Sequence, residues 1–424
     1  MRYLPLLAFS LVTAVTPLSA ADSGMVTLTK SAKDGFQLMQ GGKPYWINGI
    51  AGSVRFDLAS SMGANSVRTW GTEKLAEIVP VAKKSGMTVT VGFWLSHNGG
   101  DYINDGYRKR TTAEVERVVG QYAKDPTVLA WALGNETNAG ADTIDAWKFI
   151  GELATLCKKL DPQRPVLTVL AHPSTKTLDN LATLAPAIDM VGVNSYGGLE
   201  NWPKNLTTSK FGGPFIVTEW GANGHWEVAK TSWGAPLEQT STDKAEMYGK
   251  RLKFIESQKP RCLGSYVFLW GQKQERTPTW YSMFTETVPS LGLAAQSYGT
   301  VDAMAVGWSG KPLKDHAPLL EPLRPTGMTS EAKIAAGALL KVTAQATDPD
   351  RDKLTYAWEV MAEATQLGNG GSHEGRPGSI AGAILGSGAS IAVTVAKPGN
   401  YRLFVYVTDA HGKAATANFP FQVQ

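Results

Sequence analysis

The stretch VLAWALGNETN, residues 128–138, decides the fold class of this chain. Its first six residues are all apolar, and so short an unbroken run is typical of a buried strand. The run stops at Gly134, and a polar cluster that includes Asn135 and Glu136 follows at once. The pattern therefore predicts a buried strand whose carboxyl end carries amide and acidic side chains.

Seven further runs rich in Val, Ile and Trp repeat this pattern. They cover residues 45–51, 66–71, 87–96, 166–171, 190–196, 215–221 and 263–271. Helical segments, in which apolar residues recur every three or four positions, alternate with them at residues 73–85, 112–124, 142–160 and 241–258. Eight such units in roughly 250 residues predict an α/β fold, a closed (β/α)8 barrel or TIM barrel, within residues 22–309. An open doubly wound sheet is the alternative, and it is disfavoured because no glycine-rich phosphate turn follows the first strand.

The C-terminal quarter of the chain has a different pattern. Residues 310–327 contain four prolines and no periodicity, which predicts a linker. Residues 328–424 then alternate like strands at residues 339–346, 354–360, 390–396 and 401–408, with turn-forming residues between them. Short strands at this spacing predict a small all-β, immunoglobulin-like sandwich.

The N-terminus has the features of a secretory signal. Arg2 precedes an apolar stretch at residues 4–15, and the small residues Ser19, Ala20 and Ala21 follow. This predicts a signal peptide over residues 1–21 and an exported protein, periplasmic or secreted. A membrane anchor is the alternative, but the run is shorter than the roughly 20 residues that a span needs.

Composition excludes several classes of protein. The 41 Lys and Arg against 37 Asp and Glu leave a net charge of +4, too small a bias for a nucleic-acid-binding protein. Two cysteines exclude a disulfide scaffold. Two separate buried thiols are favoured over one bridge, because Cys157 falls in a predicted helix and Cys262 opens a predicted strand. Tryptophan, at 13 residues, is as abundant as Tyr or Phe, and only Trp358 lies after residue 310.

Two of the predicted strands end in a carboxylate. Glu136 follows the run at residues 128–134, and Glu219 lies at the end of the run at residues 215–221. In a (β/α)8 barrel the reacting groups lie at the carboxyl ends of the strands, so both carboxylates are expected on one rim. The other strand ends add Arg68, Trp70, Trp94, His97, His172, Asn194, Ser195, Tyr196 and Trp270.

This set of side chains suits the cleavage of glycosidic bonds. One carboxyl group can protonate the leaving oxygen while a second attacks the sugar carbon, and indole rings offer flat apolar surfaces for sugar rings. The alternative is that Glu136 and Glu219 are ordinary charged strand ends, bonded to helix caps or arginines. Two carboxylates on a rim of indoles, amides and one arginine disfavour it.

The same residues resemble a known clan of enzymes. Asn135-Glu136, Glu219, Arg68 and Tyr196 are similar to the motif residues of the retaining (β/α)8 glycoside hydrolases. Pro44-Tyr45-Trp46, Ile47-Asn48-Gly49-Ile50 and the stretch MGANSVRTW at residues 62–70 resemble the barrel domain of family 2 enzymes and their relatives. The resemblance covers residues 40–290.

The resemblance implies a role for each motif residue. Glu136 would be the general acid/base, so it has to keep a proton at the working pH, and Glu219 would be the nucleophile. Asn135 would hold the 2-hydroxyl of the sugar. Arg68 and Tyr196 would stabilise the Glu219 carboxylate.

Other residues near the predicted rim are expected to contact substrate. The substrate-binding candidates are Trp94, His97, His172, Trp220 and Trp270, and residues 223–227 and 271–276 are expected to wall the cleft. Trp202, Trp226, Trp233 and Trp280 are candidates for sugar platforms, with packing anchors as the alternative. His97 and His172 fit hydrogen bonding to a sugar better than metal ligation, since no cluster of His, Asp or Glu has the spacing of zinc ligands. No cofactor motif is visible.

The segment at residues 346–358 resembles polycystic-kidney-disease-type and cadherin-like sandwich repeats. Asp348, Asp350 and Asp352 in this segment could bind calcium, and an acidic turn is the simpler alternative. Because this part has a single Trp, it is interpreted as a spacer or as a domain that docks to glycan or to the cell envelope.

Together these patterns predict an exported retaining β-glycoside hydrolase that acts on a polysaccharide, with a β-glucan as the expected substrate. Only residues 22–44 separate the predicted signal from the first strand, which leaves no room for the sandwich domains that precede the barrel in typical family 2 enzymes. This favours a chain-acting enzyme over a galactosidase or a glucuronidase. A transglycosylase with the same covalent intermediate, a non-catalytic glycan-binding barrel and a structural envelope protein stay open.

Overall fold

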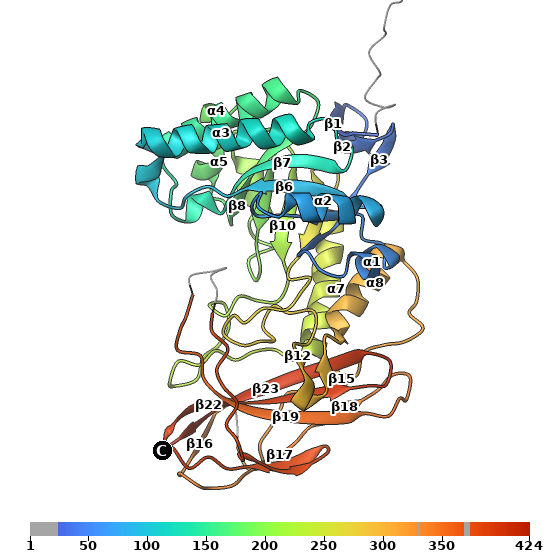
Figure 1. Ribbon diagram of the computed structural model, residues 1–424, viewed down its shortest axis with the longest axis vertical. Helices are drawn as coiled ribbons and strands as arrows, with labels where there is room; N and C mark the ends of the chain where they lie inside the picture. The colour runs from blue at the N-terminus through green and yellow to red at the C-terminus, as the bar shows by residue number, and fades with distance from the viewer. Residues whose placement is uncertain (1–23, 329–330, 369–373) are drawn as a thin grey trace, which may run out of the picture.

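The computed structural model describes residues 24–328, 331–368 and 374–424. A helix-covered barrel lies at one end of the molecule and a β-rich C-terminal part at the other (Figure 1). The predicted signal peptide, residues 1–21, lies outside the described residues.

Eight parallel strands close into a barrel. They are β4 (Ile47–Ala51), β5 (Ser66–Arg68), β6 (Thr88–Phe93), β7 (Val128–Asn135), β8 (Val166–Ala171), β9 (Met190–Asn194), β10 (Phe215–Trp220) and β11 (Cys262–Val267). The strands neighbour one another in chain order, and β11 pairs with β4 to complete the circle. Each strand overlaps one of the eight predicted runs. The prediction of a (β/α)8 barrel is confirmed, and the open sheet is excluded.

Helices surround the barrel. They are α1 (Phe56–Ser61), α2 (Leu75–Lys84), α3 (Asp105–Tyr122), α4 (Ile144–Leu160), α5 (Thr175–Leu184), α6 (Pro203–Thr208), α7 (Ser241–Ser257) and α8 (Gly299–Ser309). Helix α4 begins where the side chain of Thr143 accepts a hydrogen bond from the N–H of Ala146. Helix α7 begins with a reciprocal pair of hydrogen bonds between Thr240 and Asp243. Both caps satisfy N–H groups that a helix start leaves unpaired.

Strand β7 shows why most positions of the barrel strands are apolar. Ala130 and Ala132 belong to the core inside the barrel, whereas Trp131 and Leu133 belong to the core between the barrel and its helices. Successive side chains of a strand point to opposite faces, and here both faces are covered. Polar side chains are therefore concentrated at the strand ends.

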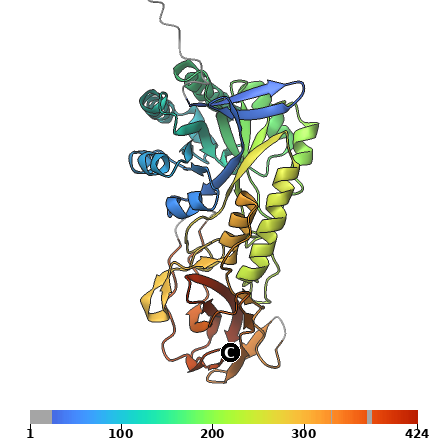
Figure 2. The same cartoon turned by 90° about the vertical axis from the view of Figure 1, so that its right-hand side faces the viewer.

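A small antiparallel sheet precedes the barrel. It consists of β1 (Val26–Ser31), β2 (Gly35–Gln40) and β3 (Lys43–Tyr45). Val26 and Leu38 join the core inside the barrel. Figure 2 places the sheet at the end of the barrel away from the C-terminal part. These strands were not predicted, because polar and charged side chains interrupt their alternation.

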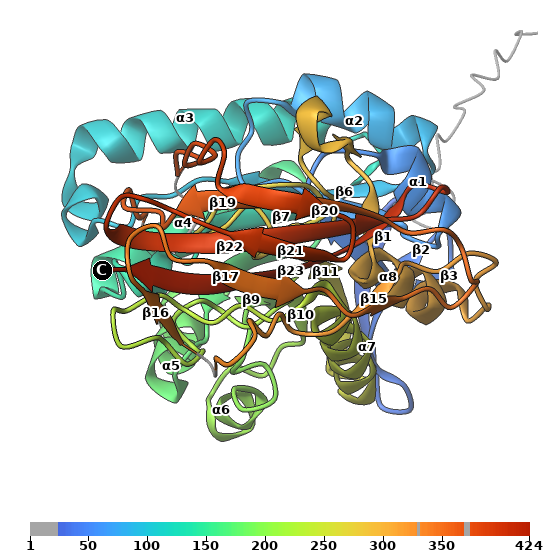
Figure 3. The same ribbon diagram turned by 90° about the horizontal axis from the view of Figure 1, so that it is seen from below.

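Two packed sheets form most of the C-terminal part (Figure 3). The larger contains β14 (Ser297–Tyr298), β23 (Lys413–Val423), β22 (Gly399–Thr408), β19 (Thr355–Ala362) and β16 (Ala332–Ile334), and the smaller contains β17 (Leu340–Thr343), β21 (Ser390–Val393) and β20 (Ile384–Ser387). Val342 and Val393 of the smaller sheet share one core with Leu403 and Phe421 of the larger. The all-β prediction is confirmed; the likeness to polycystic-kidney-disease-type and cadherin-like repeats stays a prediction.

The segment at residues 310–327 is not a free linker. Its strand β15 (Leu319–Leu320) pairs with β18 (Ala346–Thr347), and Leu320 and Leu323 lie in the core of the sandwich. Strand β14, which precedes α8, pairs with β23. A short hairpin of β12 (Thr287–Val288) and β13 (Leu293–Ala294) comes just before it. The sandwich thus includes residues on both sides of the predicted boundary at 309, and two of the four prolines, Pro318 and Pro325, are buried in it.

A buried polar cluster joins the sandwich to the barrel. Glu238 Oε1 accepts hydrogen bonds from Lys244 Nζ at 2.6 Å and from the Thr279 hydroxyl at 2.9 Å. Glu238 Oε2 accepts from the Thr277 hydroxyl at 2.7 Å and from Asn418 Nδ2 of β23 at 2.6 Å. The Glu238 side chain is 1% exposed. The hydrogen bonds of one carboxylate therefore connect the loops after β10 and β11 to β23, the longest strand of the sandwich.

Cys157 in α4 and Cys262 in β11 are both buried and free, as the sequence favoured. Every helix among the described residues is too short or too polar to cross a membrane.

The acidic turn is closed by its own side chain. Asp348 Oδ1 accepts hydrogen bonds from the N–H groups of Asp350 and Asp352, which is the usual reason for Asp in a turn. In the described ranges, the one group of three acidic oxygens close enough to share a cation is that of Asp315, Asp352 and Asp409, within 4.8 Å of one another. Asp348, Asp350 and Asp352, considered above as possible calcium ligands, do not form such a group.

Candidate active site

A cavity of about 380 Å³ opens at the carboxyl ends of the barrel strands, and Glu136 and Glu219 both line it. The strand ends also contribute Trp70, Trp94, His97, Asn135 and Tyr196. The β11 end and the loops after β10 and β11 contribute Trp226, Phe268, Leu269, Lys273, Glu275 and Tyr281. The structure thus brings the two predicted catalytic carboxylates together on one rim.

Glu136 leaves the end of β7 in a left-handed conformation, with φ 53° and ψ 30°. Non-glycine residues rarely adopt this conformation, and it turns the chain sharply out of the strand. Asn194 Nδ2 donates a hydrogen bond to Glu136 Oε1 at 2.8 Å. Burial raises the pKa of Glu136, and the nearby charge of Glu219 raises it further, to about 7. Glu136 can therefore keep a proton near neutral pH.

Three donors hold the carboxylate of Glu219, whose side chain is 8% exposed. Trp70 Nε1 donates to Oε1 at 2.7 Å, Arg68 Nη1 donates to the same oxygen at 3.2 Å, and the Tyr196 hydroxyl donates to Oε2 at 2.8 Å. Hydrogen bonds to an ionised group are stronger than those between neutral groups. These contacts fix the orientation of the Glu219 side chain.

Arg68 is buried and links the ends of four strands. Its Nη2 donates to Asn135 Oδ1 at 2.9 Å, and its Nη1 also donates to the Thr218 carbonyl at 2.9 Å. Asn194 Nδ2 donates to Asn135 Oδ1 at 3.1 Å. Both hydrogen bonds to the Asn135 side chain use its oxygen, so its amide nitrogen has no partner among the described residues and can serve a sugar hydroxyl.

Trp94 and His97 form one edge of the cavity. Their ring centroids are 5.4 Å apart, and Trp94 is 52% exposed. His97 Nε2 donates to the backbone carbonyl of Asn135 at 2.7 Å. His97 therefore holds the loop after β6 against the end of β7, while Trp94 offers an open indole face.

A second depression of about 460 Å³ lies on the other side of Glu136. It shares Glu136, Tyr196 and Trp226 with the first cavity, and His172 lies at its edge. His172 Nδ1 is 3.5 Å from the Ser195 hydroxyl. There is accordingly room for a bound chain on both sides of the candidate acid.

Trp220 and Trp270 do not line either depression. Trp220 is fully buried against Tyr248 of α7, and Trp270 is fully buried against Phe284 and Trp308. The prediction that these two indoles contact substrate is wrong. Side chains alternate along a strand, so an inward Glu219 sends Trp220 outward to the helices.

The four candidate sugar platforms have different surroundings. Trp226 is 53% exposed and lines both depressions. Trp202 is buried against Phe215, and Trp280 is buried with its Nε1 donating to the Asn223 carbonyl, so both are packing anchors. Trp233 lines a different cavity.

The two predicted cleft walls are present. The loop after β10 supplies Trp226, and the loop after β11 supplies Lys273 and Glu275, whose charged ends are 2.7 Å apart.

Two residues of the site had no role in the sequence-based predictions. Trp70 donates to Glu219, and Asn194 contacts both Asn135 and Glu136. The signal for both was present in the sequence. Trp70 lies two residues after Arg68, and Asn194 two residues before Tyr196, so the two-residue period of a strand predicts one face for each pair.

Replacing Trp70 with Phe is expected to lower kcat/KM by about 10- to 100-fold. The substitution keeps an aromatic ring but removes a hydrogen bond to a charged group, which is worth about 1.5–3 kcal/mol. Steady-state kinetics measure the effect. The matched control is Trp147→Phe in α4, because Trp147 Nε1 also donates to a carboxylate, that of Asp142, at 2.7 Å. An equal loss of activity in both variants would contradict a specific role for Trp70.

Residues 58–235 match the family model described as "Glycosyl hydrolases family 2, TIM barrel domain". The matched segment contains β5 to β10, and so it includes Arg68, Glu136 and Glu219.

Two curated relatives share part of the chain. A β-glucuronidase of Paenibacillus borealis is 31% identical over 196 residues, which are 40% of this chain and 31% of the relative. A probable mannan endo-1,4-β-mannosidase C of Aspergillus terreus is 29% identical over 160 residues, which are 30% of this chain and 38% of the relative. The chain therefore spans about a third of the length of these relatives.

Solved structures share the fold at low sequence identity. The β-galacturonidase of Eisenbergiella tayi superposes with a TM-score of 0.53 at 16% identity, over 68% of this chain and 55% of that chain. The β-D-glucuronidase of Dictyoglomus thermophilum superposes with a TM-score of 0.52 at 19% identity, over 68% of this chain and 54% of that chain. Similarity at this level shows a common fold.

Proposed function

We propose that this protein is a retaining β-glycoside hydrolase. One observation carries the proposal: a single cavity holds a carboxyl group with a pKa of about 7, that of Glu136, together with a second carboxylate, Glu219, that three donors orient. Acid and nucleophile in glycoside cleavage need this division of roles. The match to a family 2 barrel and the two curated glycosidases support the same reaction class.

In the first half of the proposed reaction, Glu136 gives its proton to the glycosidic oxygen as that bond breaks. A carboxylate oxygen of Glu219 attacks the anomeric carbon from the opposite face and forms a covalent glycosyl-enzyme. The free amide group of Asn135 binds the 2-hydroxyl of the sugar. Arg68, Trp70 and Tyr196 keep the attacking carboxylate in place.

In the second half, Glu136 is a carboxylate and accepts a proton from water. The oxygen of that water attacks the anomeric carbon, and Glu219 leaves as a carboxylate. Two inversions at the same carbon restore the β configuration.

The stereochemistry of the first product tests this proposal. Proton NMR of a reaction in progress should show the β anomer before the α anomer grows in by mutarotation. An α anomer that appears first would overturn the double displacement. Products longer than the substrate would assign the second half to a sugar acceptor, which is the transglycosylase alternative.

The proposed substrate is a β-linked polysaccharide, with β-glucan as the first candidate. Depressions on both sides of Glu136 suit a chain that continues in both directions. Glucose units in a β-glucan carry equatorial hydroxyls and expose flat apolar faces, which suit the open indoles of Trp94 and Trp226.

A three-way comparison of substrates tests the choice of sugar. The rate on a β-glucan is compared with the rates on a β-mannan and on an aryl β-glucuronide, because the relatives carry the names mannosidase and glucuronidase. A higher rate on mannan or on the glucuronide would reassign the sugar and leave the catalytic pair unchanged.

The activity is expected to fall at alkaline pH. Glu136 has to be protonated in the free enzyme, and its pKa is about 7. The value of kcat/KM should therefore decline as the pH rises through about 7, by tenfold per unit well above it. Replacing Glu219 with Gln removes one cause of the raised pKa, so the pKa of Glu136 should fall in that variant while burial still holds it above the ordinary value. Carbon-13 NMR of the glutamate side chains measures the pKa in both proteins, and an unchanged value would contradict the coupling.

We also propose that the enzyme works outside the cytoplasm, on the basis of the signal pattern at residues 1–21. Mass spectrometry of the protein recovered from culture medium or periplasm should show an N-terminus near Ala21 or Asp22. Recovery of the chain with Met1 from the cytoplasm alone would overturn it.

A further inference from the structure

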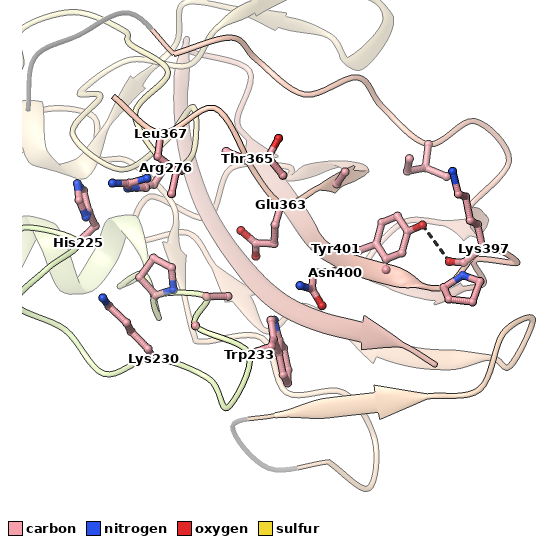
Figure 4. A pocket seen from close by; sticks show the side chains of 18 residues that line it. His225, Lys230, Trp233, Arg276, Glu363, Thr365, Leu367, Lys397, Asn400 and Tyr401 are labelled. Carbon is pink, nitrogen blue, oxygen red and sulfur yellow. Dashed lines mark hydrogen bonds between the residues drawn. The ribbon is translucent and has the colours of Figure 1, made fainter. Parts of the chain in front are cut away.

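A cavity of about 630 Å³, distinct from the two depressions at the strand ends, lies between the barrel and the sandwich, and we call it the second cavity. The barrel side is formed by the loops after β10 and β11, and the sandwich side by the segment after β19 and the start of β22. Figure 4 shows Lys230, Trp233, Arg276 and Glu363 around one hollow. A volume of this size accommodates a short oligosaccharide.

The second cavity shares a wall with the catalytic cavity. Trp226 and Glu275 line the catalytic cavity, whereas their chain neighbours His225 and Arg276 line the second one. The rings of His225 and Trp226 meet edge to face, with centroids 4.8 Å apart. Arg276 has a φ of 62°. The same two loops therefore present side chains to both cavities.

The charges around the second cavity are mainly positive. Lys230, Arg276 and Lys397 line it, and Glu363 is its one carboxylate. Glu363 is already paired with Arg402 Nε at 2.9 Å. Neither Lys230 nor Lys397 has an ion-pair partner within the described part of the chain. Arg276 Nη1 lies 3.9 Å from Glu374 Oε1, so its charge is partly compensated, whereas both lysines are unpaired among the described residues. Two such cations beside a neutralised carboxylate favour an anionic ligand.

Two buried donors in this wall have no acceptor. Arg276 Nη1 and Trp233 Nε1 are both inaccessible and without a hydrogen-bond partner among the described residues. The nearest carboxylate to Arg276 Nη1, that of Glu374, is 3.9 Å away, which is beyond hydrogen-bond distance. These two side chains thus leave donors unsatisfied in the wall of the cavity, which buried polar groups in native proteins rarely do.

We propose that this interface cavity is a second glycan-binding site, and that it takes an acidic oligosaccharide whose sugars carry carboxylates. Lys230 and Lys397 pair with the carboxylates, and Trp233 supplies an aromatic surface for a sugar ring. Asn400 Oδ1 accepts from Gln422, so the Asn400 amide nitrogen is the group available to hydroxyls. The site would hold an acidic chain beside the catalytic cavity. Binding of an acidic chain at this site does not depend on which bond Glu136 and Glu219 cleave.

Isothermal titration with the full chain carrying Glu219→Gln tests the proposal. The probes are a tetramer of β-linked glucuronate and a neutral glucose tetramer of the same length. The glucuronate tetramer should bind, and Trp233→Ala should weaken that binding by about tenfold or more, as removal of a central aromatic contact does. The double variant Lys230→Gln, Lys397→Gln should weaken it as well and flatten its dependence on salt.

The matched control for Trp233→Ala is Trp94→Ala on the catalytic rim. Binding that is lost in Trp94→Ala and kept in Trp233→Ala would assign the acidic chain to the catalytic cavity and overturn the proposal. Absence of glucuronate binding, or displacement of the tetramer by an equal concentration of sulfate, would also overturn it. Hydrolysis of neutral β-glucan by the unaltered protein is measured separately, so a failure of the hydrolase proposal is distinguished from a failure of this one.

Discussion

A Glu219→Gln variant is expected to lose at least about 10⁴-fold in kcat, which corresponds to about 5 kcal/mol of transition-state stabilisation. The amide keeps the size of the side chain but cannot form the glycosyl-enzyme. Three donors converge on this side chain, so the substitution also leaves one of them facing an NH₂ group. Turnover of an aryl β-glycoside measures the loss. The matched control is Glu200→Gln, an exposed carboxylate before α6, which should retain full activity.

Azide distinguishes the roles of the two carboxylates. In a Glu219→Gly variant, azide can occupy the space of the nucleophile and attack the anomeric carbon, which yields a glycosyl azide of the α configuration. In a Glu136→Ala variant the covalent intermediate still forms from a substrate with a good leaving group, and azide then yields the β configuration. The same configuration from both variants would contradict the assignment of acid and nucleophile.

A Glu238→Ala variant is expected to reduce the free energy of unfolding by about 3–5 kcal/mol. The substitution leaves the buried ammonium of Lys244 without its partner, and breaking a buried ion pair on one side has a cost of this size. It also removes the acceptor of Thr277, Thr279 and Asn418. Urea denaturation followed by fluorescence and by far-ultraviolet circular dichroism measures the change.

The matched control for this variant is Glu246→Ala on the same helix as Lys244. Glu246 pairs with Lys250 at 3.5 Å, with both side chains more than two-thirds exposed. Its replacement should change the free energy of unfolding by less than about 0.5 kcal/mol. Equal effects of the two substitutions would mean that the cluster around Glu238 does not hold the sandwich to the barrel.

The barrel could be predicted because its strands are buried on both faces. A run such as that of β7 is apolar at every position, so it is visible without knowledge of what covers it. Strand β1 was missed because Lys30 interrupts the alternation that Val26 and Leu28 begin, and β2 because Leu38 and Met39 are adjacent apolar residues. The longest strand of the sandwich, β23, was missed because it begins with Lys413 and a stretch of small residues that has no strong period of two.

The domain boundary could not be predicted for a different reason. Prolines mark places where a regular element stops, and Pro318 and Pro322 flank the short strand β15, which stays within the fold. The pairing of β15 with β18 and of β14 with β23 joins residues far apart in the chain. The residue pattern within a short segment of sequence does not predict pairing with a distant strand.

The convergence of Glu136 and Glu219 on one cavity was predictable because strand ends in a barrel share one face. The same reasoning failed for Trp220, whose position next to Glu219 places it on the opposite side of the strand. Trp220 was assigned to the cavity because it is adjacent to Glu219 in the sequence, but only residues two apart in a strand share a face. For Trp202 and Trp280, exposure in a loop depends on what packs over the loop, which the sequence alone does not give.

The pairing of β14 with β23 has a consequence for how such a protein can be recombined. The segment that completes the larger sheet of the sandwich is encoded on the barrel side of residue 309, and it lies between the last barrel strand and the helix α8. A gene exchange at the proline segment would therefore separate a strand from its sheet and leave an open edge on each fragment. The unit that can be exchanged intact is therefore the barrel together with its sandwich.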